Sequence, residues 1–506
     1  MSKPKVKPQA RLGSSAHANP KTKTSAAMKY ASVGTAKTAS LAGKKFHFIG
    51  AGGVGMSGLA QLLLKNRAIV TGSDQTASSI TARLSQLGAD IHVGHSPDNI
   101  ALDTDVVVVS AAIRQDNPEL RLARQRGCKI YKYAQMLGEL MHRYQGIAVA
   151  GTHGKSTTTA WLSFLLRQAG IDVSFVVGAE VSQLGSSCGV GDSMYFVAEA
   201  CEYDRSFLNL KPKIACILNI EQDHLDYYKD ENEIVDAFGQ FASGTRPGGV
   251  VIANGQDANV ARMLARTNLQ DGANNVRCET FGFDKGCDFH ARNVHLVDGV
   301  YTFDLFHNSD RLGVTRISLP GKHNVLNALA VVALGVNIGL PGEDILRLLP
   351  AFVGVDRRLM LKGRVRQVTI LDDYAHHPTE IRATLEAIRQ RYQPKRIWCV
   401  FQPHQYSRTR FLLDDFAESF KLADVTIVPE IYFVRDSEAS RKQVNSEILV
   451  QRIRANGTHA MFIDSFDSIC SHLTRNVAAD DLVVTMGAGD IWKVADEYIA
   501  RLKAGS

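Results

Sequence analysis

From Lys44 onward, short runs of β-branched residues alternate with longer amphipathic segments, and this alternation limits the folds that the chain can adopt. Such a pattern is typical of parallel sheets whose strands are joined by crossover helices. We therefore predict an α/β protein in which three domains follow a basic tail. The predicted divisions are a tail at 1–40 and domains at 41–145, 146–352 and 353–506.

The candidate strands fall into three groups, one for each domain. They lie at 45–49, 68–72, 105–109 and 128–131; at 147–150, 194–198, 214–218 and 250–253; and at 366–371, 396–401, 425–429, 460–463 and 481–486. The most apolar stretch, 325–340, contains Asn327 and Asn337, which favours a buried helix over a membrane span. Ligands of open α/β sheets bind beyond the carboxyl ends of the strands, and all three groups carry polar clusters there.

Charge and cysteine usage exclude several classes of protein. Residues 1–40 contain eight Lys or Arg and no acid, so the net charge of +7 falls to −1 over residues 41–506. A nearly neutral body gives no electrostatic basis for binding nucleic acid. The tail has too few apolar residues to form a core or a signal peptide, and we predict that it is disordered. The eight cysteines form no Cys-x-x-Cys pair, which indicates a reduced, cytoplasmic protein without a zinc cluster.

A glycine-rich segment, Gly-Thr-His-Gly-Lys-Ser-Thr-Thr-Thr at 151–159, lies between a predicted strand and a predicted helix. It is a shortened relative of the Walker A loop, in which Val149 takes the place of the first glycine. In such a loop the backbone N–H groups cradle phosphates, while Lys155 would reach the β/γ oxygens and Ser156 would ligate Mg²⁺. The predicted nucleotide-binding residues are Gly151, Thr152, His153, Gly154, Lys155, Ser156 and Thr157.

Acidic and His side chains follow the next two strands of this group. Glu199 comes directly after the strand at 194–198, where a carboxylate would suit Mg²⁺. His224 follows the strand at 214–218 among carboxylates, where it would ligate a second cation or orient the attacking group. Taken alone, a solvated loop with a hydrogen-bonded His is an equally simple interpretation of this second segment.

Two further pairs of residues are candidates for nucleotide contacts. Asn324 and Asn327 are three residues apart, so they share a helix face that would suit adenine, although Asn324 is also compatible with a helix cap. The pair Arg357-Arg358 lies near the second domain boundary and offers a charge to a phosphoryl transition state, unless it is a plain surface pair.

A second glycine-rich turn, Gly-Ala-Gly-Gly-Val-Gly at 50–55, opens the first domain between a strand and a helix. Asp74 ends the next strand, and this combination is typical of a nucleotide diphosphate site. The motif alone does not distinguish NAD from another diphosphate, or from a turn without a ligand.

The third domain concentrates polar residues after two of its strands. Asp-Asp-Tyr-Ala-His-His-Pro-Thr-Glu at 372–380 follows the first, and Phe-Gln-Pro-His-Gln-Tyr-Ser-Arg at 401–408 follows the second. We expect these two strands to be adjacent. Their His, Tyr and Arg side chains would then suit a small ligand that carries a carboxylate, with Arg as a bidentate clamp.

With these motifs in this order, residues 44–500 closely resemble the Mur ligase family, and within it the members that add L-alanine to UDP-N-acetylmuramate. The most specific pieces are those at 151–155, 372–380 and 401–404. The resemblance implies an N-terminal Rossmann-like UDP-binding domain, a central P-loop ATPase-type domain and a C-terminal Rossmann-like domain that admits the amino acid. It also implies an ATP-dependent ligase of peptidoglycan precursor synthesis, in the service of cell wall, cell shape and cell division. Such an enzyme forms an acyl phosphate, releases ADP and phosphate, and uses two Mg²⁺ ions, which Mn²⁺ can replace.

The resemblance further implies a role for each matching residue. The uridine diphosphate side would be held by Gly52, Gly53, Val54, Gly55 and Asp74. Beyond the loop at 151–157, ATP would meet Asn324, Asn327, Arg358 and Asp373, the last of these at the ribose. The metal ligands would be Ser156, Glu199 and His224, and the catalytic residues Lys155, His224 and Arg358. The amino-acid side would be lined by Tyr374, His376, His404 and Arg408.

Three departures from the family pattern have consequences. No Lys occurs in 231–249, so we expect no carbamylated lysine of the kind that sister ligases use. Glu-Ala-Cys-Glu-Tyr-Asp stands at 199–204 where the family often has Glu-Ala-Asp-Glu-Ser-Asp, which leaves the roles of the acids after Glu199 open. Gln405 stands where several members have Arg, which removes one positive charge near the substrate.

Three other functions are compatible with the sequence, which does not fix the oligomeric state. They are a recycling ligase that attaches a preformed peptide to UDP-N-acetylmuramate, a nicotinamide-dependent oxidoreductase built on the turn at 50–55, and a catalytically silent P-loop scaffold. Because each domain would hold one substrate, we also predict an open form in which Arg358 and Asp373 reach ATP only on domain closure.

Overall fold

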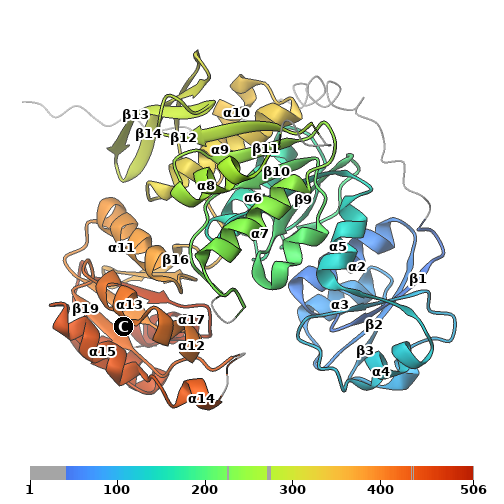
Figure 1. Ribbon diagram of the computed structural model, residues 1–506. Helices are drawn as coiled ribbons and strands as arrows, with labels where there is room; N and C mark the ends of the chain where they lie inside the picture. The colour runs from blue at the N-terminus through green and yellow to red at the C-terminus, as the bar shows by residue number, and fades with distance from the viewer. Residues whose placement is uncertain (1–40, 225–226, 270–274, 435, 437, 505–506) are drawn as a thin grey trace, which may run out of the picture.

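The computed structural model describes residues 41–224, 227–269, 275–434, 436 and 438–504. The tail at 1–40, with its predicted disorder, lies outside these residues. The described chain forms three α/β units, each built around its own sheet (Figure 1). Among the described helices, none combines the length and the apolar character that crossing a membrane requires.

The N-terminal unit contains a parallel sheet of five strands in the order β3-β2-β1-β4-β5. The strands are β1 (Lys45–Ile49), β2 (Ile69–Asp74), β3 (Asp90–Val93), β4 (Val106–Val109) and β5 (Lys129–Lys132), and the helices are α2 (Val54–Lys65), α3 (Ser79–Gln86), α4 (Pro118–Gln125) and α5 (Tyr133–Met141). The four predicted strands are present, and β3 was missed because its sequence, Asp-Ile-His-Val, has no apolar run. The strand order reverses between β1 and β4, so the glycine-rich turn after β1 lies where such sheets bind ligands.

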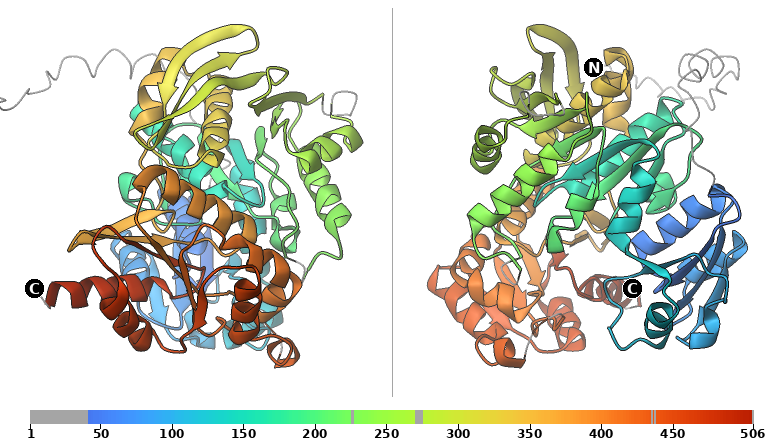
Figure 2. Two further views of the ribbon diagram at one scale, coloured as in Figure 1. Left: turned by 90° about the vertical axis from the view of Figure 1, so that its left-hand side faces the viewer. Right: turned by 45° about the vertical axis from the view of Figure 1, so that its right-hand side comes forward.

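The central unit contains a sheet of ten strands in the order β15-β14-β13-β12-β11-β10-β6-β9-β7-β8. Its strands are β6 (Gln145–Ala150), β7 (Ser174–Val176), β8 (Cys188–Gly189), β9 (Tyr195–Ala200), β10 (Ile214–Ile217), β11 (Val250–Asn254), β12 (Arg277–Gly282), β13 (Phe289–Val297), β14 (Val300–His307) and β15 (Asp310–Arg316). Its helices are α6 (Lys155–Gln168), α7 (Glu231–Ser243), α8 (Ala258–Arg266), α9 (His323–Ile338) and α10 (Gly342–Leu348). The predicted buried helix is confirmed as α9. The antiparallel strands β13–β15 form one end of this sheet and lie at the top of both views in Figure 2.

The C-terminal unit contains a sheet of six strands in the order β16-β17-β21-β18-β19-β20. The strands are β16 (Met360–Val365), β17 (Val368–Asp373), β18 (Ile397–Phe401), β19 (Val425–Val428), β20 (Ala460–Phe462) and β21 (Leu482–Met486), and the helices are α11 (Pro378–Tyr392), α12 (Tyr406–Phe411), α13 (Leu413–Ser419), α14 (Glu438–Arg441), α15 (Ser446–Ala455), α16 (Phe466–Asn476) and α17 (Trp492–Ala504). The prediction that β17 and β18 are adjacent is wrong, because the last strand, β21, pairs with both and separates them.

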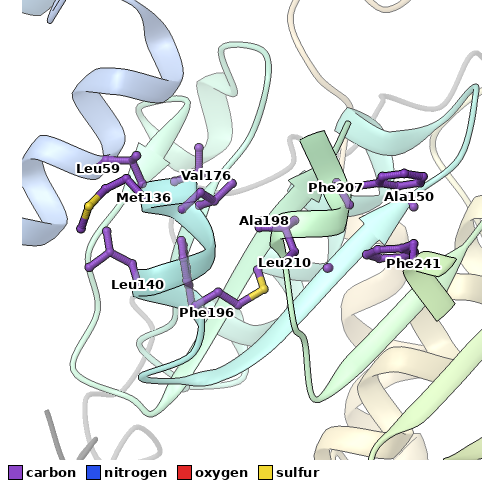
Figure 3. Close-up of a cluster of buried hydrophobic side chains, with 14 of the residues drawn as sticks. Leu59, Met136, Leu140, Ala150, Val176, Phe196, Ala198, Phe207, Leu210 and Phe241 are labelled. Atoms are coloured by element: carbon purple, nitrogen blue, oxygen red, sulfur yellow. The ribbon is translucent and has the colours of Figure 1, made fainter. Parts of the chain in front are cut away.

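The N-terminal and central units share one hydrophobic cluster. Leu59 of α2 and Met136 of α5 belong to the same buried cluster as Val176 of β7 and Phe196 of β9 (Figure 3). Helix α2 approaches the central sheet closely at Gly58, where an added Cβ would lie 3.1 Å from Val176 Cγ2. The buried clusters of the C-terminal unit, in contrast, contain only residues of that unit. The first two units are therefore joined by an apolar core, and the third is not.

Candidate active site

The turn between β6 and α6 has the backbone of a phosphate-binding loop. Gly151 has φ +147° and Gly154, the N-cap of α6, has φ +85°, a region that favours glycine. The Lys155 ammonium donates to Thr152 O at 3.0 Å and lies 2.9 Å from Glu202 Oε1. Burial alone would lower the pKa of Lys155, but the charge of Glu202 outweighs it and raises the pKa. Lys155 is therefore a partly buried cation whose present partners are groups that a phosphate can replace.

Replacing Gly154 by alanine is expected to raise the KM for ATP about tenfold, because a Cβ there would lie 2.7 Å from Oδ1 of Asn327, one of the predicted adenine-binding residues. Gly185 is the matched control, since it has φ +73° and no atom within 4 Å of an added Cβ. Gly185→Ala carries the same kind of backbone strain without the contact. Steady-state kinetics should therefore show an unchanged KM for Gly185→Ala, and equal effects of the two variants would contradict the assignment.

Two carboxylates lie on either side of Lys155. Glu199 is the penultimate residue of β9, and its carboxylate accepts the Gly178 N–H at 2.5 Å and a hydrogen bond from Ser156. Burial raises the pKa of Glu199, and these hydrogen bonds and the charge of Lys155 partly offset the rise. Glu202 was not among the predicted site residues, although it follows the same strand as Glu199. A hydroxyl and a carboxylate at the start of α6 are the oxygen ligands that Mg²⁺ prefers, so Ser156 and Glu199 fit such an ion.

His224 and its neighbour Asp223 lie after β10. His224 has φ +55°, and its Nε2 is 3.6 Å from Glu202 Oε1, so the ring faces Glu202 rather than Glu199. Asp223 accepts from Arg408 Nε and Nη2 at 3.1 and 2.9 Å. Burial would raise the pKa of Asp223, but the Arg408 guanidinium holds it well below its usual range. Arg408, predicted on the amino-acid side, is thus also a buried link between the central and C-terminal units.

A cavity of about 370 Å³ lies between the central and C-terminal units. Its lining brings together most of the predicted nucleotide residues: His153, Gly154, Ser156, Thr157, Asn324, Asn327, Arg358 and Asp373. Arg358 and Asp373 therefore already face the phosphate-binding loop. Polar contacts between His153 and Glu380 and between Arg408 and Asp223 join the two units in this arrangement, and the open form stays a prediction.

Neighbouring groups fix the polar residues of this cavity. Asn327 Nδ2 donates to Asn324 Oδ1 at 2.9 Å, and Asn324 Nδ2 donates to Pro320 O at 2.7 Å. Asn324 is not the cap of α9, since the N-cap residue is Lys322. Asp373 accepts the N–H groups of Leu359 and Ala375 at 2.6 and 2.7 Å. Burial raises the pKa of Asp373 to about 6 against the effect of the nearby Arg358 charge.

The two members of the arginine pair differ in environment. Arg357 donates to Asp372 at 3.0 Å and to Gly487 O at 2.8 Å, so it holds two strand ends of the C-terminal sheet together. Arg358 lines the cavity, with its guanidinium carbon 5.0 Å from the Tyr374 ring centre and Nη1 3.6 Å from Glu380. Only Arg358 is placed to meet a phosphate.

The predicted amino-acid residues form one cluster, although β21 lies between their strands. The rings of Tyr374 and His376 are 5.3 Å apart, and those of His376 and His404 are 6.1 Å apart. Arg408 Nη1 lies 3.5 Å from His404 Nδ1. Burial lowers the pKa of His376 to about 4, so the His376 ring is neutral at pH 7.

The glycine-rich turn of the N-terminal unit is fixed by Asp74, whose Oδ2 accepts the Gly52 N–H at 2.8 Å. Gly53 is the N-cap of α2 and Val54 is its first residue. An added Cβ at Gly55 would lie 2.6 Å from the Tyr133 ring, so only glycine fits. Four of the five predicted residues thus form one turn at the carboxyl end of β1, and the fifth, Asp74 at the end of β2, holds that turn.

Sequence reasoning missed several acidic residues that face the loop at 151–157. Glu221 bonds His153 at 2.9 Å, and Glu380 bonds the same ring at 3.1 Å. Both follow strand ends, as Glu202 does, and this position was the available signal. Many polar residues follow strand ends, and Glu221 and Glu380 differ from the others because they meet at the contact between the central and C-terminal units.

Comparisons with known proteins agree with this arrangement. Three models of the Mur ligase family match the chain: the catalytic domain at 45–145, the middle domain at 149–335 and the glutamate ligase domain at 357–489. UDP-N-acetylmuramate–L-alanine ligases of Acetivibrio thermocellus and Geobacter sp. are 41% and 42% identical over 461 and 462 residues. These alignments cover 90% and 91% of this chain and 96% and 98% of the relatives.

Solved structures give the same result. The UDP-N-acetylmuramate–alanine ligase of Thermotoga maritima is 28% identical, with a TM-score of 0.74 over 91% of this chain and 100% of that one. A murein peptide ligase of Psychrobacter arcticus is 27% identical, with a TM-score of 0.66 over 91% and 99% of the two chains. Together with the matched models, these similarities show that the chain belongs to the Mur ligase family.

Proposed function

We propose that this protein uses ATP to join L-alanine to the lactyl carboxylate of UDP-N-acetylmuramate, with ADP and phosphate as the other products. One observation carries the proposal: a single cavity combines the phosphate-binding loop of the central unit with Arg358 and Asp373 of the C-terminal unit. The relatives at 41% and 42% identity bear the name of this ligase. The proposed domains at 41–145, 146–352 and 353–506 would each supply the binding residues for one substrate.

In the first step a lactyl carboxylate oxygen attacks the γ-phosphorus of ATP, and the bond to the ADP oxygen breaks. Two anions must approach each other, so the site has to offset their repulsion. Lys155 at the start of α6 and Arg358 in the cavity lining would supply positive charge, and the backbone N–H groups of the loop would bind phosphate oxygens. Ser156 and Glu199 would hold one Mg²⁺ and His224 would help to hold a second, which would neutralise phosphate charge. Mn²⁺ is expected to replace Mg²⁺.

In the second step the amine of L-alanine attacks the acyl carbon, and phosphate leaves from a tetrahedral intermediate. Tyr374, His376, His404 and Arg408 would surround the amino acid, while Asn324, Asn327 and Asp373 would bind the adenosine. The sugar nucleotide would bind at Gly52, Gly53, Val54, Gly55 and Asp74. His224 or an ordered water would accept the ammonium proton. We propose no role for a carbamylated lysine, since 231–249 contains no Lys.

Phosphate release from ATP, measured with each substrate omitted in turn, tests this proposal. We expect release only when UDP-N-acetylmuramate, L-alanine and Mg²⁺ are all present, with ADP and not AMP as product. A tripeptide in place of L-alanine is the control for the recycling reaction. A higher rate with the tripeptide would favour that reaction, and binding of a nicotinamide nucleotide at 50–55 would favour an oxidoreductase.

A further inference from the structure

The ring of His153 bonds two carboxylates at once. Nε2 lies 2.9 Å from Glu221 Oε2, and Nδ1 lies 3.1 Å from Glu380 Oε1. Ionised carboxylates only accept hydrogen bonds, so both ring nitrogens must donate, which only the imidazolium can do. The main-chain N–H of His153 is bonded to Asn219 Oδ1 at 2.8 Å. His153 thus uses its ring for a contact other than phosphate binding.

The two carboxylates belong to different domains. Glu221 follows β10 in the central unit, and Glu380 lies in the first turn of α11 in the C-terminal unit. Thr379, next to Glu380, donates its hydroxyl to Glu221 Oε1 at 2.5 Å. The phosphate-binding loop is therefore tied to α11 through two side-chain bridges.

Glu380 connects this contact to the rest of the cavity. Its Oε2 accepts the His376 N–H at 3.0 Å, and its Oε1 lies 3.6 Å from Arg358 Nη1. Loss of the His153 bond would remove the contact that ties the loop directly to α11, and with it the direct link from the loop to the carboxylate beside Arg358. The position of Arg358 relative to the loop thus depends on a residue that does not touch Arg358.

We propose that His153 is a positioning residue whose imidazolium clamps the C-terminal domain onto the phosphate-binding loop and thereby places Arg358 in the cavity. The kinetic part of this inference rests on the proposed function, whereas the structural part does not. One residue of the phosphate-binding loop, His153, would thus also hold the C-terminal domain in the closed arrangement.

The charged and titratable groups around the ring favour the imidazolium. Glu221 and Glu380 face the two nitrogens, the His377 ring centre is 4.9 Å away, and Arg358 and His323 are the other cationic or titratable groups nearby. Burial alone would lower the pKa of His153, but the hydrogen bonds to Glu221 and Glu380 outweigh it and raise the pKa to about 9. A raised pKa stabilises the closed form at low pH, and this contribution is lost as the pH rises through about 9.

A metal ion at the same place is the competing interpretation. His153, Glu221 and His377 are the one group of potential ligands with metal-binding spacing among the described residues. His377, however, accepts the Thr379 N–H at Nδ1 and faces Gln222 O with Nε2, both at 3.3 Å. Both of its ring nitrogens therefore have main-chain partners, and the hydrogen-bonded clamp accounts for all three side chains.

Small-angle X-ray scattering of the full chain with ADP and Mg²⁺ tests the clamp without turnover. We expect a larger radius of gyration for His153→Gln, whose amide carries no charge and has one donor nitrogen in place of the two separate ring nitrogens of His153. His295→Gln is the matched control, since His295 lies exposed on β13 and bonds only its own strand, and it should scatter like the wild type. The wild type should expand as the pH rises through about 9, and His153→Gln should show no such transition.

Kinetics provide the second measurement. His153→Gln should raise the KM for ATP about tenfold, because charge-assisted hydrogen bonds across the closed interface are lost. Thr379→Val removes a bond from the other domain and should shift both quantities in the same direction by less, which keeps the test valid if His153→Gln does not fold. Equal scattering and equal KM for His153→Gln and the wild type would overturn the proposal. Stoichiometric Zn²⁺ binding that disappears in His153→Gln would also overturn it, in favour of a metal site. An expanded His153→Gln in a protein that does not ligate the substrates would support the clamp and reject only the proposed function.

Discussion

Lys155→Ala is expected to lower kcat about 10²–10³-fold, which is the usual effect of removing one preorganised group that stabilises developing charge. Lys155 is partly buried, positively charged and held at the start of α6 by Gly151, Thr152 and Glu202. The carboxylate and the γ-phosphate are both anionic, so the loss should appear mainly in kcat and not in the KM for the sugar nucleotide. Phosphate release under saturating substrates measures it directly.

Lys285→Ala is the control for this substitution, because Lys285 lies exposed on the same domain and outside the cavity. It should leave kcat and KM unchanged. Removing Lys155 also leaves Glu202 without its cation, so the thermal unfolding midpoint of Lys155→Ala should be measured in parallel. A folded Lys155→Ala enzyme with wild-type kcat would mean that the loop is a silent scaffold.

Glu199→Gln is expected to lower kcat by a similar factor of about 10²–10³ and to raise the Mg²⁺ concentration needed for half-maximal rate. The neutral amide keeps the size of the side chain and can still accept from Ser156 and Gly178, but it loses the charge that a divalent cation requires. A titration with Mg²⁺ separates the two effects, because excess Mg²⁺ should restore part of the lost rate.

Glu180→Gln is the matched control, since Glu180 is exposed in the same domain and does not line the cavity. Its Mg²⁺ dependence should equal that of the wild type. Complete chelation of divalent cations should stop phosphate release in all variants. Turnover that persists without divalent cations would show that Glu199 has another role.

Local sequence was enough to predict several buried strands of each sheet and the two glycine-rich turns. The strands that were found, such as β6 and β10, are buried on both faces and appear as apolar runs. The strands that were missed are very short or carry polar residues, as β8 and β13 do. Glycine patterns were informative because a position such as Gly154 has a positive φ, and this requirement of the backbone acts within a few residues.

The contacts between domains could not be predicted in the same way. His153 and Glu380 are 227 residues apart, and Asp223 and Arg408 are 185 apart. No periodicity links such pairs, because their meeting depends on how two separately formed sheets dock. The order of β17, β21 and β18 was misjudged for a related reason, since the inserted strand comes from the end of the chain.

The hydrophobic cluster shared by the first two units has a consequence for biosynthesis. The apolar face of α2 around Leu59 becomes fully buried only after Val176, Phe196 and the later members of the cluster have left the ribosome. Until then the nascent chain exposes an apolar surface of the kind that chaperones bind. The last domain brings its own core, so it can fold as it emerges and dock afterwards through charged side chains.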